Sequence, residues 1–179
     1  MKIALTGHTS GIGKALFDIL SQEHEIVCFS RSNGYDIDTR AEDIVQESLD
    51  WDVDVFINNA YSELAQVNIL NRLWEFWARD KSKTIVNISS LSKYPGISGN
   101  TSGYSAHKAA LSHQAFLLMF KGNRKCRMIN VNPGYVESKM TEGVTANMLT
   151  APECAEQIAH AINLPQHIEI GELSLWRPY

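Results

Sequence analysis

A tyrosine and a lysine four residues apart form the most chemically suggestive pair in the sequence. Tyr104 and Lys108 lie in a stretch whose pattern predicts a helix over residues 103–121, so both side chains project from one helix face as neighbours. A nearby ammonium favours the phenolate and should lower the pKa of the tyrosine from its ordinary value of about 10. A phenol tuned in this way can donate a proton to a carbonyl oxygen or remove one from an alcohol. Taken alone, a Tyr–Lys pair at this spacing is usually a surface contact.

Two serines end the apolar run in front of this helix. The segment Thr84–Ser89 (TIVNIS) predicts a buried strand, and Ser89 and Ser90 stand at its end. Serines at a strand end usually act as turn residues. Here they also follow a strand of a predicted α/β sheet, where ligands bind beyond the carboxyl ends of the strands. The serines are therefore candidates for the same site as the Tyr–Lys pair.

A glycine-rich turn follows the first predicted strand, Lys2–Thr6. The segment Thr6–Gly13 reads TGHTSGIG and opens a predicted helix over residues 11–21. Glycines permit positive φ and close approach of a ligand, and a helix N-terminus offers free N–H groups and a partial positive charge to a pyrophosphate. A tight turn without a ligand is the alternative. The position between a strand and a helix favours dinucleotide binding, although the spacing is not GxGxxG.

The elements that must position these residues alternate along the whole chain. The other predicted strands cover residues 25–29, 53–58, 126–131 and 168–176, with a very short one at 34–37, and the other predicted helices cover residues 38–49, 63–79 and 152–163. Such alternation implies right-handed βαβ crossovers and a mostly parallel sheet covered on both faces. We therefore expect a Rossmann-type, doubly wound α/β fold of about seven strands. Residues 1–179 should form a single dinucleotide-binding domain.

Composition excludes several classes of protein. The 179 residues are 44% hydrophobic and 20% charged, which is ordinary for a globular domain and argues against disorder. The net charge of −4, with no Lys/Arg cluster along the chain, gives no reason to expect a nucleic-acid partner. Three distant cysteines without a CxxC pair, and histidines without ligand spacing, argue against disulfides and metal sites. The N-terminus resembles neither a signal peptide nor a membrane span, so we expect a cytoplasmic protein without a membrane partner.

Five motifs in order resemble those of the short-chain dehydrogenase/reductase family. The glycine turn is similar to the family's cofactor turn, and Asn58-Asn59-Ala60 is similar to the start of its NNAG motif. IVNISS resembles the strand that carries its catalytic serine, Tyr104–Lys108 its YxxxK motif and Asn132–Ser138 its PGxVxT loop. The resemblance implies hydride transfer between a nicotinamide dinucleotide and a small carbonyl or secondary alcohol. A non-catalytic dinucleotide-binding or redox-sensing module remains the alternative.

The resemblance implies roles for individual residues of the catalytic group. Tyr104 matches the acid/base, and Lys108 matches the residue that lowers its pKa and binds the nicotinamide ribose. Ser90 matches the serine that holds the substrate oxygen, with Ser89 as the reserve.

An asparagine completes that group in the family by supporting a water relay to the lysine. Asn68 aligns with it, and Asn71 is the competitor. A polar residue on an ordinary helix face is the alternative for both.

The cofactor-binding positions implied by the resemblance are spread over the whole set of motifs. They are Gly7, Thr9, Ser10, Gly11, Ile12, Gly13, Arg31, Ser32, Asp36, Ile37, Asn59, Ala60, Tyr61, Tyr104, Lys108, Pro133, Gly134, Val136 and Ser138. The last four would form the wall against the nicotinamide carboxamide.

Cofactor preference depends on the residues after the second predicted strand. An acidic residue there bonds the ribose 2′-OH of NAD, whereas an arginine accommodates the 2′-phosphate of NADP. Positions 29–32 read FSRS, so Arg31 can pair with a phosphate, helped by the hydroxyls of Ser30 and Ser32. The acidic alternative, Asp36 next to Ile37, better matches the family's adenine contact. We therefore expect NADP(H) rather than NAD(H).

The chain departs from the family pattern in three places, one of which is an abbreviated connection from Tyr61 to the predicted helix that contains Asn68. After Asn59-Ala60 the family has glycine and this chain has Tyr61, which we expect to crowd the cofactor ribose or close the pocket. Only four residues separate Arg31 from Asp36, where the family inserts a helix before its third strand. These differences leave the catalytic positions in place and shorten one flank of the adenosine site.

Two predicted helices, residues 63–79 and 103–121, carry more apolar side chains than one stripe requires. A second buried face would account for this surplus, and packing within the core is the alternative. Because family members often pair such helices across a two-fold axis, we expect a homodimer or homotetramer.

Overall fold

The computed structural model describes residues 1–95 and 103–178, and within this part six parallel strands form one sheet. The strands are β1 (Lys2–Thr6), β2 (Glu25–Phe29), β3 (Val55–Asn58), β4 (Thr84–Ile88), β5 (Arg127–Pro133) and β6 (Glu172–Leu175). Their order in the sheet is β2-β1-β3-β4-β5-β6. This topology confirms the expected Rossmann-type α/β fold.

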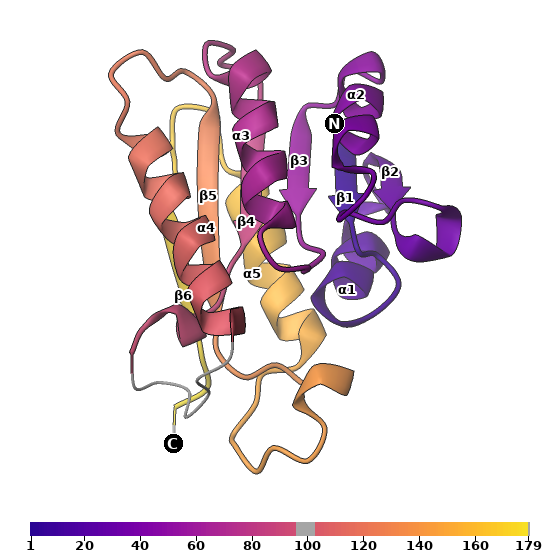
Figure 1. Cartoon of the computed structure of the whole chain (residues 1–179), viewed down its shortest axis with the longest axis vertical. Coiled ribbons are helices and arrows are strands. Elements are labelled where there is room, and N and C mark those ends of the chain that lie inside the picture. The colour runs from indigo at the N-terminus through magenta and orange to yellow at the C-terminus, as the bar shows by residue number, and fades with distance from the viewer. Residues whose placement is uncertain (96–102, 179) are drawn as a thin grey trace.

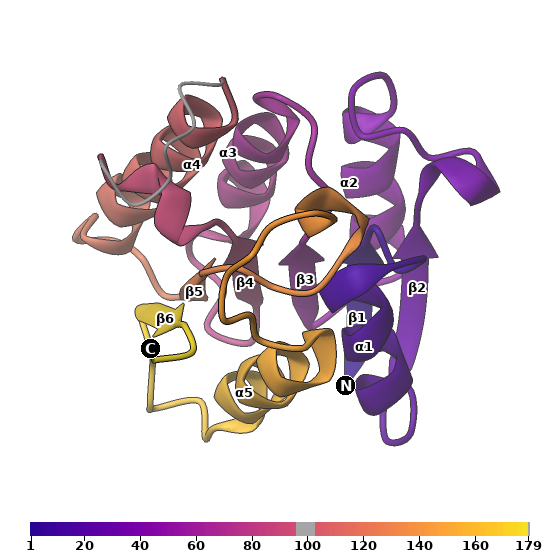
Figure 2. The ribbon, with the colours of Figure 1, turned by 90° about the horizontal axis from the view of Figure 1, so that it is seen from below.

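Helices cover both faces of the sheet (Figures 1 and 2). They are α1 (Gly11–Leu20), α2 (Ala41–Asp50), α3 (Ala65–Trp77), α4 (Gly103–Met119) and α5 (Ala151–Asn163). In Figure 2, α1 and α5 lie on one side of the sheet, and α2, α3 and α4 lie on the other. Three short 3₁₀ turns, η1 (Arg31–Asn33), η2 (Leu91–Lys93) and η3 (Lys139–Thr141), lie in the connections.

Strand side chains alternate between two cores, one for each helical layer. Ile3 and Leu5 of β1 belong to the core under α1 and α5, whereas Ala4 and Phe56 belong to the core under α2, α3 and α4. Because helices cover both faces, the central strands are buried along their whole length, as their near-continuous apolar sequences predict.

The short strand expected at residues 34–37 does not form, which accounts for the difference between six strands and the expected seven. The chain leaves β2 through η1 instead, because Ser30 and Asn33 form a reciprocal capping box. Gly34 then turns in the left-handed region with a φ of 90°, and Tyr35 packs edge-on against Phe29. Strand β2 is therefore the edge of the sheet.

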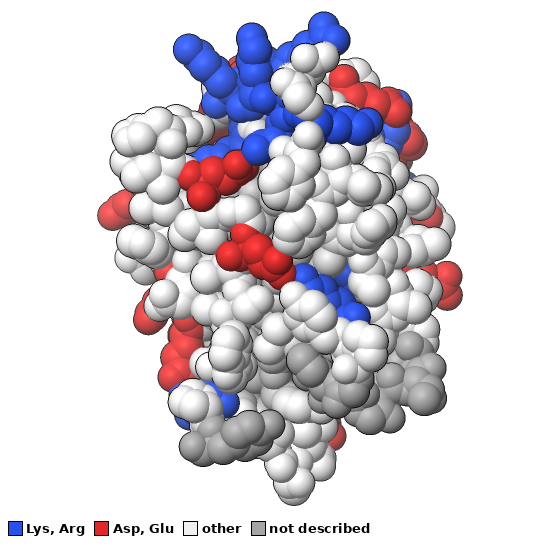
Figure 3. Space-filling view, turned by 90° about the vertical axis from the view of Figure 1, so that its left-hand side faces the viewer, with Lys and Arg blue, Asp and Glu red and all other residues white. Residues whose placement is uncertain are grey.

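Cations gather at the amino-terminal edge of the sheet, contrary to the expectation from the linear sequence. Exposed Arg79 and Lys81 precede β4, and exposed Lys121 and Lys125 precede β5. The two loops are joined by a 2.7 Å hydrogen bond from the Lys125 backbone N–H to the Ala78 carbonyl. Figure 3 shows the resulting basic area at the top of the molecule. It lies at the opposite end of the strands from the residues with candidate chemistry.

No helix in the described part of the chain combines the length and the apolar composition that crossing a membrane requires.

Candidate active site

A cleft of about 1480 Å³ opens at the carboxyl-terminal edge of the sheet, the edge that faces the viewer in Figure 2. Its walls come from the glycine turn after β1, the segments after β2, β3 and β4, the first turns of α4 and the loop after β5. Every expected cofactor-binding residue lines this cleft, as do Ser90 and Ser89. Residues as far apart in sequence as Gly7 and Val144 thus share one site, because parallel strands present their carboxyl ends at one edge.

The glycine turn is held tightly against the start of α1. Gly7 has a φ of 74°, and a Cβ placed on Gly13 would lie 2.1 Å from the Gly7 carbonyl oxygen. Asn59 fastens the turn from the next strand, since its Nδ2 donates to the carbonyl oxygens of Thr6 (2.9 Å) and Gly7 (3.2 Å). The Ser10 side chain makes no capping bond to α1, so the first N–H groups of that helix are open to a ligand. These features fit a pyrophosphate group.

The segment after β2 provides a cationic wall. Ser30 Oγ and Ser32 Oγ lie 2.7 Å apart, and the exposed Arg31 makes no ion pair with any described residue. The Asp36 carboxylate accepts from the Asp38 backbone N–H at 3.1 Å. An unpaired guanidinium beside two hydroxyls can accommodate a phosphate monoester.

The two serines after β4 point to different partners. Ser90 Oγ accepts from the Ser92 N–H at 3.1 Å and shares a hydrogen bond with Tyr104. Ser89 Oγ donates to the Lys108 carbonyl at 3.0 Å and lies 2.7 Å from Ser112 Oγ, so it fastens α4 to the sheet. The geometry therefore favours Ser90 as the hydroxyl that reaches a ligand.

Lys108 is buried, with 3% of its surface exposed. Its Nζ donates to Gln66 Oε1 and to the Ile88 carbonyl, both at 2.7 Å. These acceptors are uncharged, and burial lowers the pKa of Lys108 to about 7. Nζ also lies 5.6 Å from the centre of the Tyr104 ring.

The pKa of Tyr104 is raised, which is opposite to the direction expected from its spacing to Lys108. Burial is the largest cause, the hydrogen bond with Ser90 lowers the pKa, and the neighbouring Tyr61 raises it. The Lys108 amine is tied to Gln66 and to the backbone, and burial disfavours its charged form. Desolvation of the phenol therefore outweighs the effect of the nearby lysine on the pKa of Tyr104.

Gln66, and not Asn68, contacts the lysine. Asn68 is exposed on α3, because residues two apart project from nearly opposite sides of a helix. Asn71 instead accepts a 2.6 Å hydrogen bond from Gln114. The structure therefore places neither asparagine in direct contact with the lysine, and the water relay through Asn68 stays a prediction. The sequence feature that points to Gln66 is the short connection after β3. It brings the first turn of α3, which contains Gln66, against the ends of the strands.

Gln66 is itself held firmly in place. Its Nε2 donates to the backbone carbonyl of Asn58 at 2.7 Å, and the backbone carbonyl of Gln66 accepts from Asn58 Nδ2 at 2.8 Å. A second bond from Nε2 reaches the Ile88 carbonyl at 3.3 Å. The side chain thereby bridges the ends of β3 and β4 and presents its oxygen to Lys108.

Tyr61, which stands at the position where the family resemblance predicts glycine, covers the lysine with its ring. Its ring centre lies 4.7 Å from that of Tyr104 in an edge-to-face contact and 5.2 Å from Lys108 Nζ. Its hydroxyl lies 3.1 Å from His107 Nδ1, and burial raises its pKa. The ring of Tyr61 thus lies against both Tyr104 and Lys108, and the expected crowding of the cofactor ribose stays a prediction.

The loop after β5 forms the far wall of the cleft. Pro133, Gly134, Val136 and Ser138 all line it. The Gly134 N–H donates to the Leu175 carbonyl at 2.7 Å, and a Cβ on Gly134 would lie 3.3 Å from that of Trp176. The final strand therefore sets the position of this wall.

Metal-binding groups are absent from the described part of the chain, where no three His, Cys, Asp or Glu side chains are close enough to hold an ion. The three cysteines are free, and burial raises the pKa of each thiol to about 11. They suit packing and are poor nucleophiles.

Comparison with solved structures identifies the fold. No protein-family model and no curated protein matches the sequence. Among solved structures, 3-alpha-hydroxysteroid dehydrogenase from Pseudomonas sp. B-0831, complexed with NADH, is 21% identical over 98% of this chain and 95% of its own, with a TM-score of 0.78. A 3-ketoacyl-(acyl-carrier-protein) reductase from Brucella melitensis, complexed with NADH, is 16% identical over 97% and 96%, with a TM-score of 0.80. A short chain dehydrogenase from Burkholderia cenocepacia J2315, in complex with NADP, is 18% identical over 97% and 86%, with a TM-score of 0.78.

The class defined by this topology and by these similar structures is the Rossmann-type α/β fold. More narrowly, the chain has the fold of the short-chain dehydrogenases/reductases, which confirms at the level of the fold the resemblance inferred from five motifs.

Proposed function

We propose that this protein is an oxidoreductase that transfers a hydride between NADP(H) and a small carbonyl or secondary alcohol. The observation that carries the proposal is the convergence of Ser90, Tyr104 and Lys108 with the glycine turn in one cleft. Dinucleotide binding alone needs a glycine turn and a helix N-terminus; it does not need a serine bonded to a half-buried tyrosine. The solved structures with this fold include dehydrogenases and reductases complexed with NADH or NADP.

Each catalytic side chain has one task in this proposal. A reduced nicotinamide, when bound, supplies the hydride. Ser90 holds the substrate oxygen, and Tyr104 donates a proton to it as the carbonyl becomes an alcohol. The raised pKa of Tyr104 keeps the phenol protonated near neutral pH, which suits this donation. Lys108 stabilises the phenolate that remains after the proton has left.

NADP(H) is favoured by the charges near the end of β2. Arg31 is an exposed cation that lines the cleft, and no acidic residue occupies the last positions of the strand. Asp36 and Ile37 lie farther along the same wall and suit the adenine.

The decisive experiment measures NADPH oxidation against a panel of aldehydes and ketones, with Tyr104→Phe as the matched variant. We expect turnover by the wild type and a loss of at least about a hundredfold in the variant, the usual scale of general acid catalysis. Full activity in Tyr104→Phe would refute the mechanism. Tight NADPH binding without any turnover would favour the second candidate, a dinucleotide-binding sensor.

That second candidate rests on Tyr61. Its ring covers Lys108 and contacts Tyr104, so it occupies space beside the amine. A sensor would tolerate such closure, whereas an enzyme must open it in every cycle.

We further propose a homodimer or homotetramer formed through α3 and α4. Phe76, Leu117 and Phe120, on or just beyond these helices, are 51%, 52% and 79% exposed, and a second copy of the chain could bury them. Light scattering at micromolar concentration tests this, and a monomeric mass would reject it.

A cytoplasmic location is supported by the three free cysteines.

A further inference from the structure

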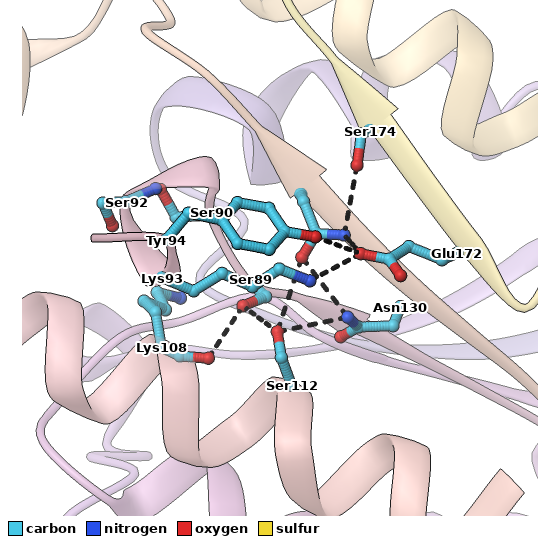
Figure 4. Close-up of polar contacts among 11 residues, drawn as sticks. Ser89, Ser90, Ser92, Lys93, Tyr94, Lys108, Ser112, Asn130, Glu172 and Ser174 are labelled. Carbon is cyan, nitrogen blue, oxygen red and sulfur yellow. Dashed lines mark hydrogen bonds and ion pairs between the residues drawn. The ribbon is translucent and has the colours of Figure 1, made fainter. Parts of the chain in front are cut away.

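A partly buried ion pair lies behind the serine turn, outside the lining of the cleft. Lys93 Nζ lies 2.5 Å from Glu172 Oε1, and the two side chains are 7% and 28% exposed. Figure 4 shows the lysine reaching from the turn after β4 to the glutamate at the start of β6. Neither residue takes part in the chemistry proposed above.

Lys93 belongs to the same turn as Ser90. Ser90 caps the N-terminus of η2: its Oγ accepts from the Ser92 N–H at 3.1 Å, and its carbonyl accepts from the Lys93 N–H at 3.2 Å. Glu172 Oε1 also accepts from the Tyr94 hydroxyl at 3.3 Å. One carboxylate thus holds the last residue of the turn and the residue that follows it.

Glu172 is in turn anchored to the sheet. Asn132 Nδ2 donates to its Oε1 at 2.6 Å, and β5–β6 pairing places Glu172 opposite Asn130. From these asparagines a chain of hydrogen bonds continues through Ser112 and Ser89 to the carbonyl of Lys108 (Figure 4). The turn that carries Ser90 and the helix that carries Lys108 are therefore fastened to one framework.

If Glu172 is lost, Lys93 has few other groups nearby to bind its charge. Apart from Glu172, the surroundings of the Lys93 amine include the rings of Tyr94 and Phe116, whose centres lie 4.8 Å and 5.9 Å from Nζ. A buried ammonium without a carboxylate is strongly unfavourable, so the lysine would have to swing towards water. Because Lys93 and Ser90 share one turn, that movement would also displace the serine hydroxyl.

We propose that Lys93 and Glu172 are positioning residues that hold Ser90 at its place beside Tyr104. The proposal rests on the proposed function for its effect on turnover, while the placement of the turn can be measured without any activity. Glu172 therefore acts on the reaction through Lys93 and Ser90 and does not touch the substrate.

The test compares Glu172→Gln with Glu169→Gln. Glu169 is an ideal control because it is also 28% exposed and pairs with Arg124 at 2.7 Å, yet lies before β6 at the edge away from the cleft. For Glu172→Gln we expect kcat to fall about tenfold, on the scale known for small misplacements, with the NADPH Kd within about twofold of wild type. Glu169→Gln should keep its kcat. Unchanged kcat in Glu172→Gln would overturn the proposal.

A double variant separates positioning from plain stability. Lys93→Met with Glu172→Gln leaves no buried unpaired charge, so its melting temperature should recover relative to Glu172→Gln alone. Because the tie to the turn is still missing, kcat should remain low. Recovery of both quantities would show that the pair serves stability only and would overturn the proposal.

Hydrogen–deuterium exchange distinguishes failure of this proposal from failure of the proposed function. Exchange at residues 90–94 should rise in Glu172→Gln and stay at the wild-type level in Glu169→Gln. If the wild type reduces no carbonyl, the proposed function fails, and this measurement alone decides whether the pair holds the turn. Equal exchange in both variants would reject the positioning role.

Discussion

Lys108 Nζ lies 2.7 Å from Gln66 Oε1, and this direct bond joins the helix that carries the candidate catalytic tyrosine to the first turn of α3. A second bond, to the Ile88 carbonyl, leaves one of the three N–H donors of the ammonium unassigned. That donor is enclosed by the rings of Tyr61 and Tyr104. The lysine is thus oriented by an amide and a backbone carbonyl, both uncharged.

Removing the Gln66 side-chain amide should lower kcat by more than any loss of folded protein would explain. In Gln66→Ala, Lys108 loses one of its two acceptors in a buried site, and we expect kcat to fall about tenfold. Steady-state NADPH oxidation measures the change. Gln114→Ala is the control, because Gln114 bonds Asn71 on the neighbouring helix and not the lysine. Equal kcat values in the two variants would show that Gln66 does not orient the lysine.

Lys108 should make stability depend on pH in the alkaline range. Its pKa is about 7 in the folded protein, whereas an unfolded lysine titrates near 10.4. Between these values the unfolded chain binds more protons than the folded one, so stability should rise with pH through this window. Lys108→Met cannot titrate, so the free energy of unfolding of wild type relative to this variant should increase from pH 7 to pH 10. A flat difference in urea unfolding would contradict the lowered pKa.

Replacing Tyr61 should open the site beside the lysine. Tyr61→Gly removes the ring that contacts Tyr104 and covers Lys108, so we expect the Kd of NADPH to fall several-fold in fluorescence titrations. Tyr61→Phe keeps the ring and loses only the hydroxyl contact with His107, so its Kd should stay within about twofold of wild type, as for the loss of one hydrogen bond. Weaker binding by Tyr61→Gly would mean that the ring supports the cofactor.

A methyl group at Gly13 should disrupt the turn. The added Cβ would meet the Gly7 carbonyl oxygen at 2.1 Å, so Gly13→Ala should lower the free energy of unfolding by about 1–3 kcal/mol, as overpacking does. NADPH binding should be lost as well, because the first turn of α1 must move. Gly122→Ala is the matched control, since nothing lies within 4 Å of its Cβ. Urea unfolding and fluorescence titration give both quantities; wild-type behaviour of Gly13→Ala would disprove the close packing.

Arg31 should select the phosphorylated cofactor. In Arg31→Ala the Kd of NADPH should rise about tenfold, the value of one charge-assisted hydrogen bond, while the Kd of NADH should hardly change. Arg40→Ala serves as the control because Arg40 pairs with Asp43 and stacks on Tyr35. An equal loss for NADPH and NADH would mean that Arg31 does not contact the 2′-phosphate.

Local patterns in the sequence were enough to predict the fold class and to predict which residues line most of the candidate site. Alternating strand and helix patterns imply parallel crossovers, and parallel strands must present their carboxyl ends at one edge. Residues that follow strands, such as Gly7, Asn59 and Ser90, therefore had to meet in one cleft, and they do. The four-residue spacing of Tyr104 and Lys108 likewise follows from helix geometry alone.

Tertiary structure decided what depends on burial and on contacts across the sheet. Gln66 replaces Asn68 at the lysine because the short connection after β3 sets which face of α3 meets the strand ends. The pKa of Tyr104 rises because desolvation depends on the neighbours that enclose the phenol, and spacing along one helix does not report those neighbours. The pairing of Lys93 with Glu172 joins residues 79 positions apart, and only strand order brings them together.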